Sequence, residues 1–245
     1  MARTEDALQR EQYVRSVKTE VAIARTRAEV AALSTELASD GIVGWGGGDL
    51  SVRVPRAELF VIKPPAGEHD DLAPENAIVC GLDGEPLPGT PGSERLPAAD
   101  VAIHARLYGE LPEIRAIIRS QSPHVLAHAA TGDSIPALLA AQAERFGGGV
   151  PIIAPPLDDV ASVAASVANA LSGGVRVILV AGDGAYVTGA SAREAVETAR
   201  LLEQLARVAV LARADGAPAS LPPSIVERLH AAFRERTAQT TDDRR

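Results

Sequence analysis

The chain has 245 residues and a mass of 25.4 kDa, which suits one large domain or at most two small ones. Hydrophobic residues make up 46% and charged residues 23%, a balance typical of a folded globular protein. The formal charge of −8 and the aromatic content of 3% argue against nucleic-acid and anionic-membrane partners, because acidic surfaces repel phosphate and few rings can stack on bases.

The N-terminal segment and the single cysteine indicate the compartment. The segment lacks the apolar core of an export signal, and no stretch reaches the roughly 18 apolar residues of a membrane span. Cys80 cannot form a disulfide within the chain, and a thiolate metal cluster would need further cysteines. We therefore expect a cytoplasmic protein with no membrane or nucleic-acid partner.

The first predicted elements are helical and then extended. Residues 3–39 repeat apolar side chains at helical spacing without Gly or Pro, which predicts one long helix or two shorter ones. A glycine-rich loop follows. The alternation in residues 50–54 and the apolar run at 59–62 then predict a hairpin. Residues 77–80 add a strand before a surface loop at 84–97.

The rest of the chain mixes helices and strands. Helical patterns are found at 98–108, 123–130, 136–146, 160–171, 191–214 and 222–236, and strand patterns at 114–118, 150–153, 175–180 and 185–188. Ser191 and Glu194 form a capping box at the start of the long helix. We expect the polar end after about residue 236 to be disordered. The pattern predicts one α/β domain.

Several segments, in this order and spacing, resemble the class II aldolase/adducin family of fuculose-phosphate aldolase-like and ribulose-phosphate 4-epimerase-like proteins. They are GDLSVR (48–53), IKPPAG (62–67), LAPEN (72–76), LDG (82–84), IIRSQSP (117–123) and ILVAGDG (178–184). The resemblance implies a three-layer α/β/α sandwich around a mostly antiparallel sheet. It also implies a homotetramer with active sites at subunit interfaces, and typical members are sugar-phosphate aldolases and epimerases that use a divalent metal.

The resemblance divides the chain into three parts. Residues 25–215 form the aldolase-like domain, residues 1–24 a helical extension, and residues 216–245 a C-terminal helix with a polar tail. These boundaries are expectations from the extent of the similarity, which runs from about residue 25 to about residue 214.

The chain departs from the family at the metal ligands. A His-x-His pair and a third histidine hold zinc in the family, and the matching positions here are Arg119, Gln121 and Asp183. An arginine keeps its proton and has no lone pair for a metal, glutamine is a poor zinc ligand, and a single aspartate does not hold a site that needs about three protein ligands. We predict no metal at this position and no other cofactor.

The acid/base and phosphate positions also differ. The family's catalytic glutamate matches Asp100, which precedes His104 by four residues and shares its helix face. The polar phosphate loops become GGGD at 46–49 and Pro-Ala at 65–66. A carboxylate facing a phosphate costs affinity, and proline removes an amide donor. The substrate is therefore predicted not to be a sugar phosphate.

The resemblance leads to candidate catalytic roles. We expect an ion pair between Arg119 and Asp183 in place of the zinc, with Arg119 stabilising an oxyanion or carboxylate, Asp183 orienting it and Asp100 carrying a proton. A purely structural pair is an equal alternative. The candidate substrate-binding residues are Gln121, Lys63, Gly48, Asp49 and His104.

Each weaker candidate has a plainer interpretation. Lys63 could reach an anion or form a Schiff base, although a surface lysine is the default. His104 is more simply a packed helix residue. His124 and His128 have the spacing of metal ligands but lack a third ligand nearby in the sequence.

The sequence favours a metal-independent class II aldolase-like enzyme, a lyase, isomerase or cyclase acting on a non-phosphorylated carbonyl or carboxylate small molecule, as in specialised metabolite biosynthesis. The alternative is a non-catalytic pseudoenzyme that acts as an oligomeric scaffold or binds a partner. A zinc aldolase with relocated ligands (Asp100, His104 and Asp183) ranks last. An enzyme should have an open cavity lined by Asp100, Arg119 and Gln121, which a scaffold could fill.

Overall fold

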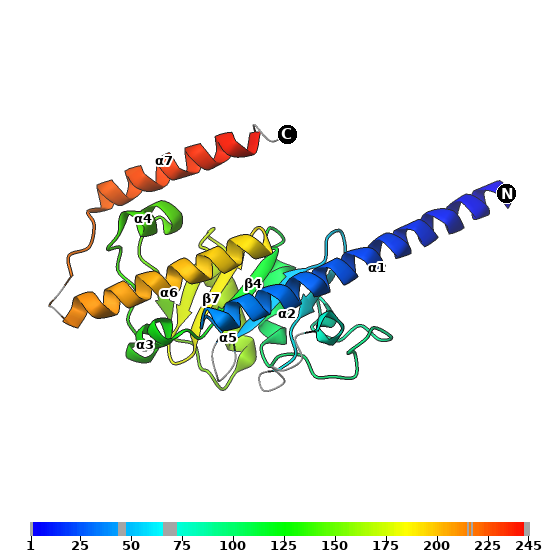
Figure 1. Cartoon of the computed structure of the whole chain (residues 1–245), viewed down its shortest axis with the longest axis horizontal. Helices are drawn as coiled ribbons and strands as arrows, with labels where there is room; N and C mark the ends of the chain where they lie inside the picture. The colour runs from blue at the N-terminus through cyan, green and yellow to red at the C-terminus, as the bar shows by residue number, and fades with distance from the viewer. Residues whose placement is uncertain (1, 44–47, 66–72, 215, 217, 243–245) are drawn as a thin grey trace.

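A seven-stranded sheet forms the centre of the molecule (Figure 1). The computed structural model describes residues 2–43, 48–65, 73–214, 216 and 218–242, with side chains between 16 and 237. The strands are β1 (Asp49–Arg53), β2 (Leu59–Ile62), β3 (Ile78–Gly81), β4 (Ala116–Ser120), β5 (Ile152–Ile153), β6 (Val177–Val180) and β7 (Gly184–Gly189). Their order is β3-β2-β1-β4-β7-β6-β5, and only β5 and β6 are parallel.

Helices cover both faces of this sheet. They are α1 (Ala2–Ser39), α2 (Val101–Glu110), α3 (Pro123–Thr131), α4 (Ala140–Phe146), α5 (Val160–Leu171), α6 (Ala192–Ala214) and α7 (Pro223–Asp242). One hydrophobic core joins the sheet to α1, α3 and α6, and a second joins its other face to α2 and α5. The predicted three-layer α/β/α architecture with a mostly antiparallel sheet is confirmed. None of the described helices is long and apolar enough to span a membrane.

Strand alternation decides which side chains meet each helical layer. Leu50 of β1 enters the core under α1 and α6, whereas its neighbours Asp49 and Ser51 point to the opposite face. Asp49 is paired with Arg119 of β4, and Arg119 is paired with Tyr186 of β7. Polar side chains from three adjacent strands therefore form a row on the face that α2 covers.

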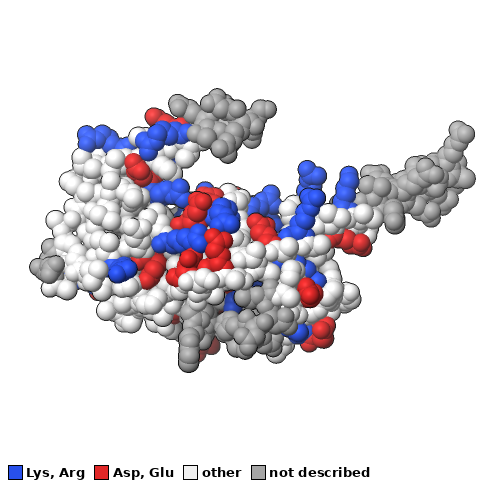
Figure 2. Space-filling model, in the orientation of Figure 1, with Lys and Arg blue, Asp and Glu red and all other residues white. Residues whose placement is uncertain are grey.

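Ion pairs join α1 to α6 on the outer surface. Glu36 contacts Arg193 at 2.8 Å and Arg200 at 2.7 Å, and Arg200 also contacts Asp40. Figure 2 shows acidic and basic side chains side by side on this face. Because these pairs are exposed, we expect each to add little stability.

Most predicted elements are present, with differences at helix ends; the helix predicted at 98–108 spans Val101–Glu110. The segment 3–39 is one continuous helix. The serine half of the predicted capping box is present, since Glu194 N donates to Ser191 Oγ at 3.1 Å, but the Glu194 carboxylate accepts from Ala190 N at 2.9 Å, one residue before the cap. The helix predicted at residue 136 begins only at Ala140, because Leu139 has extended backbone angles.

The C-terminal prediction is partly wrong. The helix does not end near residue 236 but continues to Asp242 as α7. No Gly or Pro follows Pro223 to interrupt it. Residues 243–245, the end of the expected polar tail, lie outside the described residues.

Candidate functional site

Three charged side chains from separate parts of the chain meet at one end of the sheet. Arg119 lies on β4, Asp183 lies in the turn between β6 and β7, and Asp100 immediately precedes α2. The exposed fraction is 13% for the Asp100 side chain and 16% for those of Arg119 and Asp183. The group is therefore largely removed from water but still reachable at its rim.

Arg119 contacts the two carboxyl groups in different ways. Its Nε donates to Asp183 Oδ2 at 3.1 Å and its Nη2 donates to Asp183 Oδ1, which makes a bidentate pair. Its Nη1 lies 3.0 Å from Asp100 Oδ2, but that oxygen has no aligned hydrogen-bond donor among the described residues. Two directed hydrogen bonds therefore fix Asp183 against the guanidinium, whereas Asp100 Oδ2 lies close to it without a directed bond.

A second ion pair adjoins the first. Asp49 Oδ1 lies 3.7 Å from Nζ of Lys63, and each of these side chains is 6% exposed. The carboxyl group of Asp49 also lies near that of Asp100 and raises its pKa. We call Asp49, Lys63, Asp100, Arg119 and Asp183 the Arg119 cluster. It combines three carboxyl groups with two cationic groups.

Burial and neighbouring charges shift the pKa values of Asp100 and Arg119 within the cluster. Burial is the main cause that raises the pKa of Asp100, to about 7; Arg119 opposes the shift, and Asp49 and Asp183 add to it. Burial pulls the pKa of Arg119 down, but its contacts with Asp183 and Asp100 outweigh burial and hold that pKa above its ordinary value. Near neutral pH, Arg119 is a fixed cation and Asp100 is poised to exchange a proton.

Gln121 and Gly48 border the cluster through backbone contacts. Gln121 Nε2 donates to the carbonyl oxygen of Asp183 at 3.2 Å, which supports the turn that carries this aspartate. Gly48 has a φ of +98°, and an added Cβ would lie 2.9 Å from Cα of Val43. The close backbone approach therefore explains this glycine without a ligand. Residues 44–47 of the predicted glycine loop lie outside the described residues.

Sequence reasoning missed buried hydroxyl groups beside the cluster. Ser51 Oγ lies 2.7 Å from His104 Nδ1 and 2.9 Å from the hydroxyl of Tyr108. Tyr186 lies beside Arg119 in the sheet and places its ring edge-on to His104, with centroids 6.4 Å apart. Two simple signals were available, since Ser51 shares a strand face with Asp49 and Tyr108 follows His104 by one helical turn.

The histidine pair on α3 belongs to a different part of the molecule. His124 Nδ1 lies 2.6 Å from Glu203 Oε1, and the same carboxylate accepts hydrogen bonds from the backbone N–H groups of His124 and Val125. His128 is 1% exposed, and burial lowers its pKa. Glu203 therefore anchors the start of α3, and the two histidines do not form a metal site.

The side chains of the cluster do not fit a zinc ion. No group of three His, Cys, Asp or Glu residues in the described parts of the chain is arranged to hold a metal. The guanidinium of Arg119 contacts both Asp100 and Asp183, so a cation already occupies the position between these carboxyl groups. His104 Nδ1 is engaged by Ser51. We therefore derive no step through a metal.

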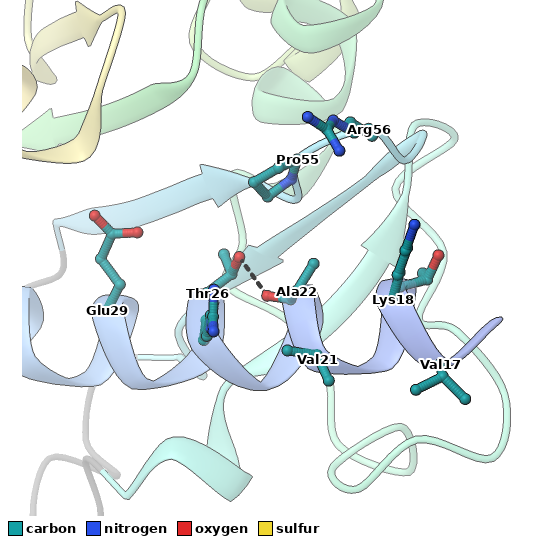
Figure 3. A pocket seen from close by; sticks show the side chains of 10 residues that line it. Val17, Lys18, Val21, Ala22, Thr26, Glu29, Pro55 and Arg56 are labelled. Carbon is teal, nitrogen blue, oxygen red and sulfur yellow. Dashed lines mark hydrogen bonds between the residues drawn. The ribbon is translucent and has the colours of Figure 1, made fainter. Parts of the chain in front are cut away.

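Two surface cavities lie elsewhere on the molecule. One of about 900 Å³ lies between α1 and the turn after β1, where Val21, Thr26 and Pro55 line it (Figure 3). The other, of about 990 Å³, is lined by Arg145 and Phe233 among others, from α4 and α7. Neither includes a residue of the Arg119 cluster, so the open cavity expected of an enzyme is not found at either place.

The fold and the position of the cluster define a protein of the class II aldolase type. Residues 28–210 match the family described as Class II Aldolase and Adducin N-terminal domain. The match covers most of the chain, and the protein belongs to this family.

Solved structures share the fold at low sequence identity. An L-fuculose 1-phosphate aldolase is 23% identical, with 86% of this chain and 96% of that chain covered and a TM-score of 0.77. YgbL from Klebsiella pneumoniae, a putative aldolase/epimerase/decarboxylase, is 24% identical, with 84% and 98% covered and a TM-score of 0.72. The L-fuculose-1-phosphate aldolase from Thermus thermophilus is 23% identical, with 81% and 100% covered and a TM-score of 0.66. These likenesses establish the fold.

Proposed function

We propose that this protein is a metal-independent enzyme of the class II aldolase fold, a lyase, isomerase or cyclase that moves a proton next to a carbonyl group. One observation carries the proposal: Arg119 holds Asp183 by two directed hydrogen bonds but contacts Asp100 without alignment. This arrangement separates a permanent electrostatic centre from a carboxyl group that exchanges protons near neutral pH.

In this mechanism Asp100 is the proton carrier. As a carboxylate it takes a proton from the carbon beside the carbonyl, and as an acid it returns that proton to carbon or to the departing group. A base works best when its pKa lies near the working pH, and the buried Asp100 carboxyl meets that condition.

Arg119 is the oxyanion stabiliser in the same mechanism. Its Nε and one Nη2 hydrogen are used by Asp183, and its Nη1 faces Asp100 without an aligned bond. A guanidinium has further N–H groups that can donate to a carbonyl oxygen as negative charge develops there. Asp183 and Gln121 act as positioning residues, because they fix the guanidinium plane and the turn beside it.

The charge balance favours an uncharged carbonyl compound over a carboxylate. Asp183 already matches the charge of Arg119, and Lys63 is paired with Asp49. A carboxylate or phosphate substrate would add negative charge where no unpaired cation remains within the cluster. An uncharged carbonyl oxygen needs only hydrogen-bond donors.

Deuterium exchange tests this function without knowledge of the natural substrate. Chelator-treated protein is incubated in D₂O with a panel of uncharged hydroxyaldehydes and hydroxyketones, and exchange beside the carbonyl is followed by NMR. We expect exchange by the wild type, a loss of about 100-fold or more in Asp100→Asn and Arg119→Lys, and no change in the surface variant Glu197→Gln. Exchange that survives both cluster substitutions contradicts the proposal.

A pseudoenzyme is the second candidate. It is favoured by one observation, that neither surface cavity reaches the Arg119 cluster. A scaffold would use the cluster only to hold β4, α2 and the β6–β7 turn together. Absence of exchange across the whole panel, in a protein whose Asp100→Asn variant is as stable as the wild type or more so, favours the scaffold.

A further inference from the structure

A buried hydrogen-bond chain connects α2 to β1 beneath the Arg119 cluster. Ser51 Oγ lies between two side chains of α2, 2.7 Å from His104 Nδ1 and 2.9 Å from the hydroxyl of Tyr108. Ser51 and His104 are 0% exposed and Tyr108 is 1% exposed. The other ring nitrogen, His104 Nε2, is buried and has no hydrogen-bond partner among the described residues.

The available protons decide which group donates and which accepts in each of these hydrogen bonds. Burial raises the pKa of Tyr108, so its hydroxyl keeps a proton that needs an acceptor. Ser51 Oγ is the acceptor that the structure provides. The proton of Ser51 then goes to its other neighbour, His104 Nδ1, which must present a lone pair. Burial lowers the pKa of His104 to about 4, so the ring is neutral and its one proton lies on Nε2.

The reverse direction leaves more groups unsatisfied. If His104 Nδ1 donated to Ser51, and Ser51 to Tyr108, the tyrosine proton would have no acceptor among the described contacts. His104 Nε2 would then present a bare lone pair in a buried place. Unpaired buried donors and acceptors each cost about 1–3 kcal/mol. The direction from tyrosine to serine to histidine leaves only the Nε2–H without a partner.

We propose that Tyr108 and Ser51 are positioning residues that fix His104 as the neutral Nε2–H tautomer, so that the buried Nε2 carries an N–H group and not a lone pair. The relevance of this tautomer to catalysis rests on the proposed function, but the test of the tautomer does not. The charged side chains that act on the ring are Asp49, which attracts an N–H, and Arg119, which opposes added positive charge.

The neutral ring has a consequence for the charges of the cluster. Burial and Arg119 oppose positive charge on His104, and together they outweigh Asp49, which favours it. The ring therefore adds no charge beside the Arg119 cluster, and proton transfer in the proposed mechanism is left to Asp100. His104 is a positioning residue, not a proton carrier.

Nitrogen-15 NMR of histidine-labelled protein reads the tautomer directly. The chain has five histidines, and the His104 signals are identified by their loss in His104→Gln. We expect a pyridine-like Nδ1 and a protonated Nε2 that stay unchanged from about pH 5.5 to about pH 8. Ser51→Ala should populate the Nδ1–H form, and Ser51→Thr, which keeps the hydroxyl, should restore the wild-type signals.

Each result supports or overturns the proposed tautomer, and no substrate is needed to obtain it. A wild-type spectrum with a protonated Nδ1, or with a charged ring in this pH range, shows that the chain runs otherwise and overturns the proposal, whether or not Ser51→Ala folds. An unchanged tautomer in folded Ser51→Ala also overturns it, because the serine would then not set the proton. The proposed function fails separately, by the deuterium-exchange result.

Discussion

Asp100 is the residue whose surroundings matter most for the proposed chemistry. It precedes α2 but makes no capping hydrogen bond to that helix, so its carboxyl group is available to Arg119 and Asp49. Only 13% of the side chain is exposed, and burial explains why its proton is held so much more tightly than in water. Asp100 is therefore a buried carboxyl group and not a solvated one at the start of a helix.

Stability should fall with rising pH because of this one group. The pKa of Asp100 is about 7 in the folded protein and about 3.9 in an unfolded chain, so the folded state binds more protons between these values. The free energy of unfolding, taken as wild type minus Asp100→Asn, should fall by about 1 kcal/mol per pH unit from about pH 4 to about pH 7. Urea unfolding of both proteins at several pH values measures it. A difference that is flat or rises with pH contradicts the assigned protonation.

Sequence reasoning located some of the site residues and the ion pair between Arg119 and Asp183, but not the other contacts of the cluster. Arg119, Asp183 and Asp100 stand at positions matched to the family's metal ligands and acid, so the resemblance selects them. The sequence alone favours a surface position for Lys63, yet this lysine is 5% exposed beside Asp49. That pairing depends on how the end of β2 meets the start of β1, which no local pattern in the sequence reports.

At the scale of elements, the sheet holds the cluster because β4 lies between β1 and β7. The hairpins were predictable from alternation and turn residues, since β1 and β2 are close in sequence, as are β6 and β7. The β4 pairings join residues more than 60 positions apart, and hydrophobic periodicity carries no information about them. The resemblance predicted three layers and a mostly antiparallel sheet, but not these pairings.

Substitution of Gly184 tests how closely the backbones of β4 and β7 approach each other, and Gly109 on α2 provides a matched control. Gly184 has a φ of +153°, and an added Cβ would lie 2.5 Å from the carbonyl oxygen of Ser120, whereas a Cβ at Gly109 on α2 meets nothing within 4 Å. We expect Gly184→Ala to lower the free energy of unfolding by about 2 kcal/mol or more. Gly109→Ala should raise it by about 0.5–1 kcal/mol.

Chemical denaturation compares the two glycine variants under one condition. A Gly184→Ala protein as stable as the wild type would show that the β6–β7 turn can move away from Ser120. The position of Asp183 beside Arg119 would then not be fixed by the backbone.

At the scale of the whole molecule, α1 extends beyond the sheet and its layers (Figure 1). Val17 and Val21 on this helix are 39% and 47% exposed, and they line the cavity beside the β1–β2 turn. Burial of such apolar side chains against another chain lowers the free energy and so favours association. The homotetramer that the family resemblance leads us to expect stays a prediction.

Light scattering coupled to size exclusion measures that assembly. We expect a mass four times the chain mass of 25.4 kDa. A monomeric mass across the micromolar range would contradict this expectation and the placement of active sites at subunit interfaces.

The central claim is that an arginine replaces the metal as the electrostatic centre of this aldolase fold. Elemental analysis of the purified protein, after growth with added zinc, manganese and iron, tests it most directly. We expect far less than one metal ion per chain in well-folded protein, because Arg119 already provides the positive charge between Asp100 and Asp183. Stoichiometric metal that a chelator removes together with the deuterium-exchange activity would contradict the account.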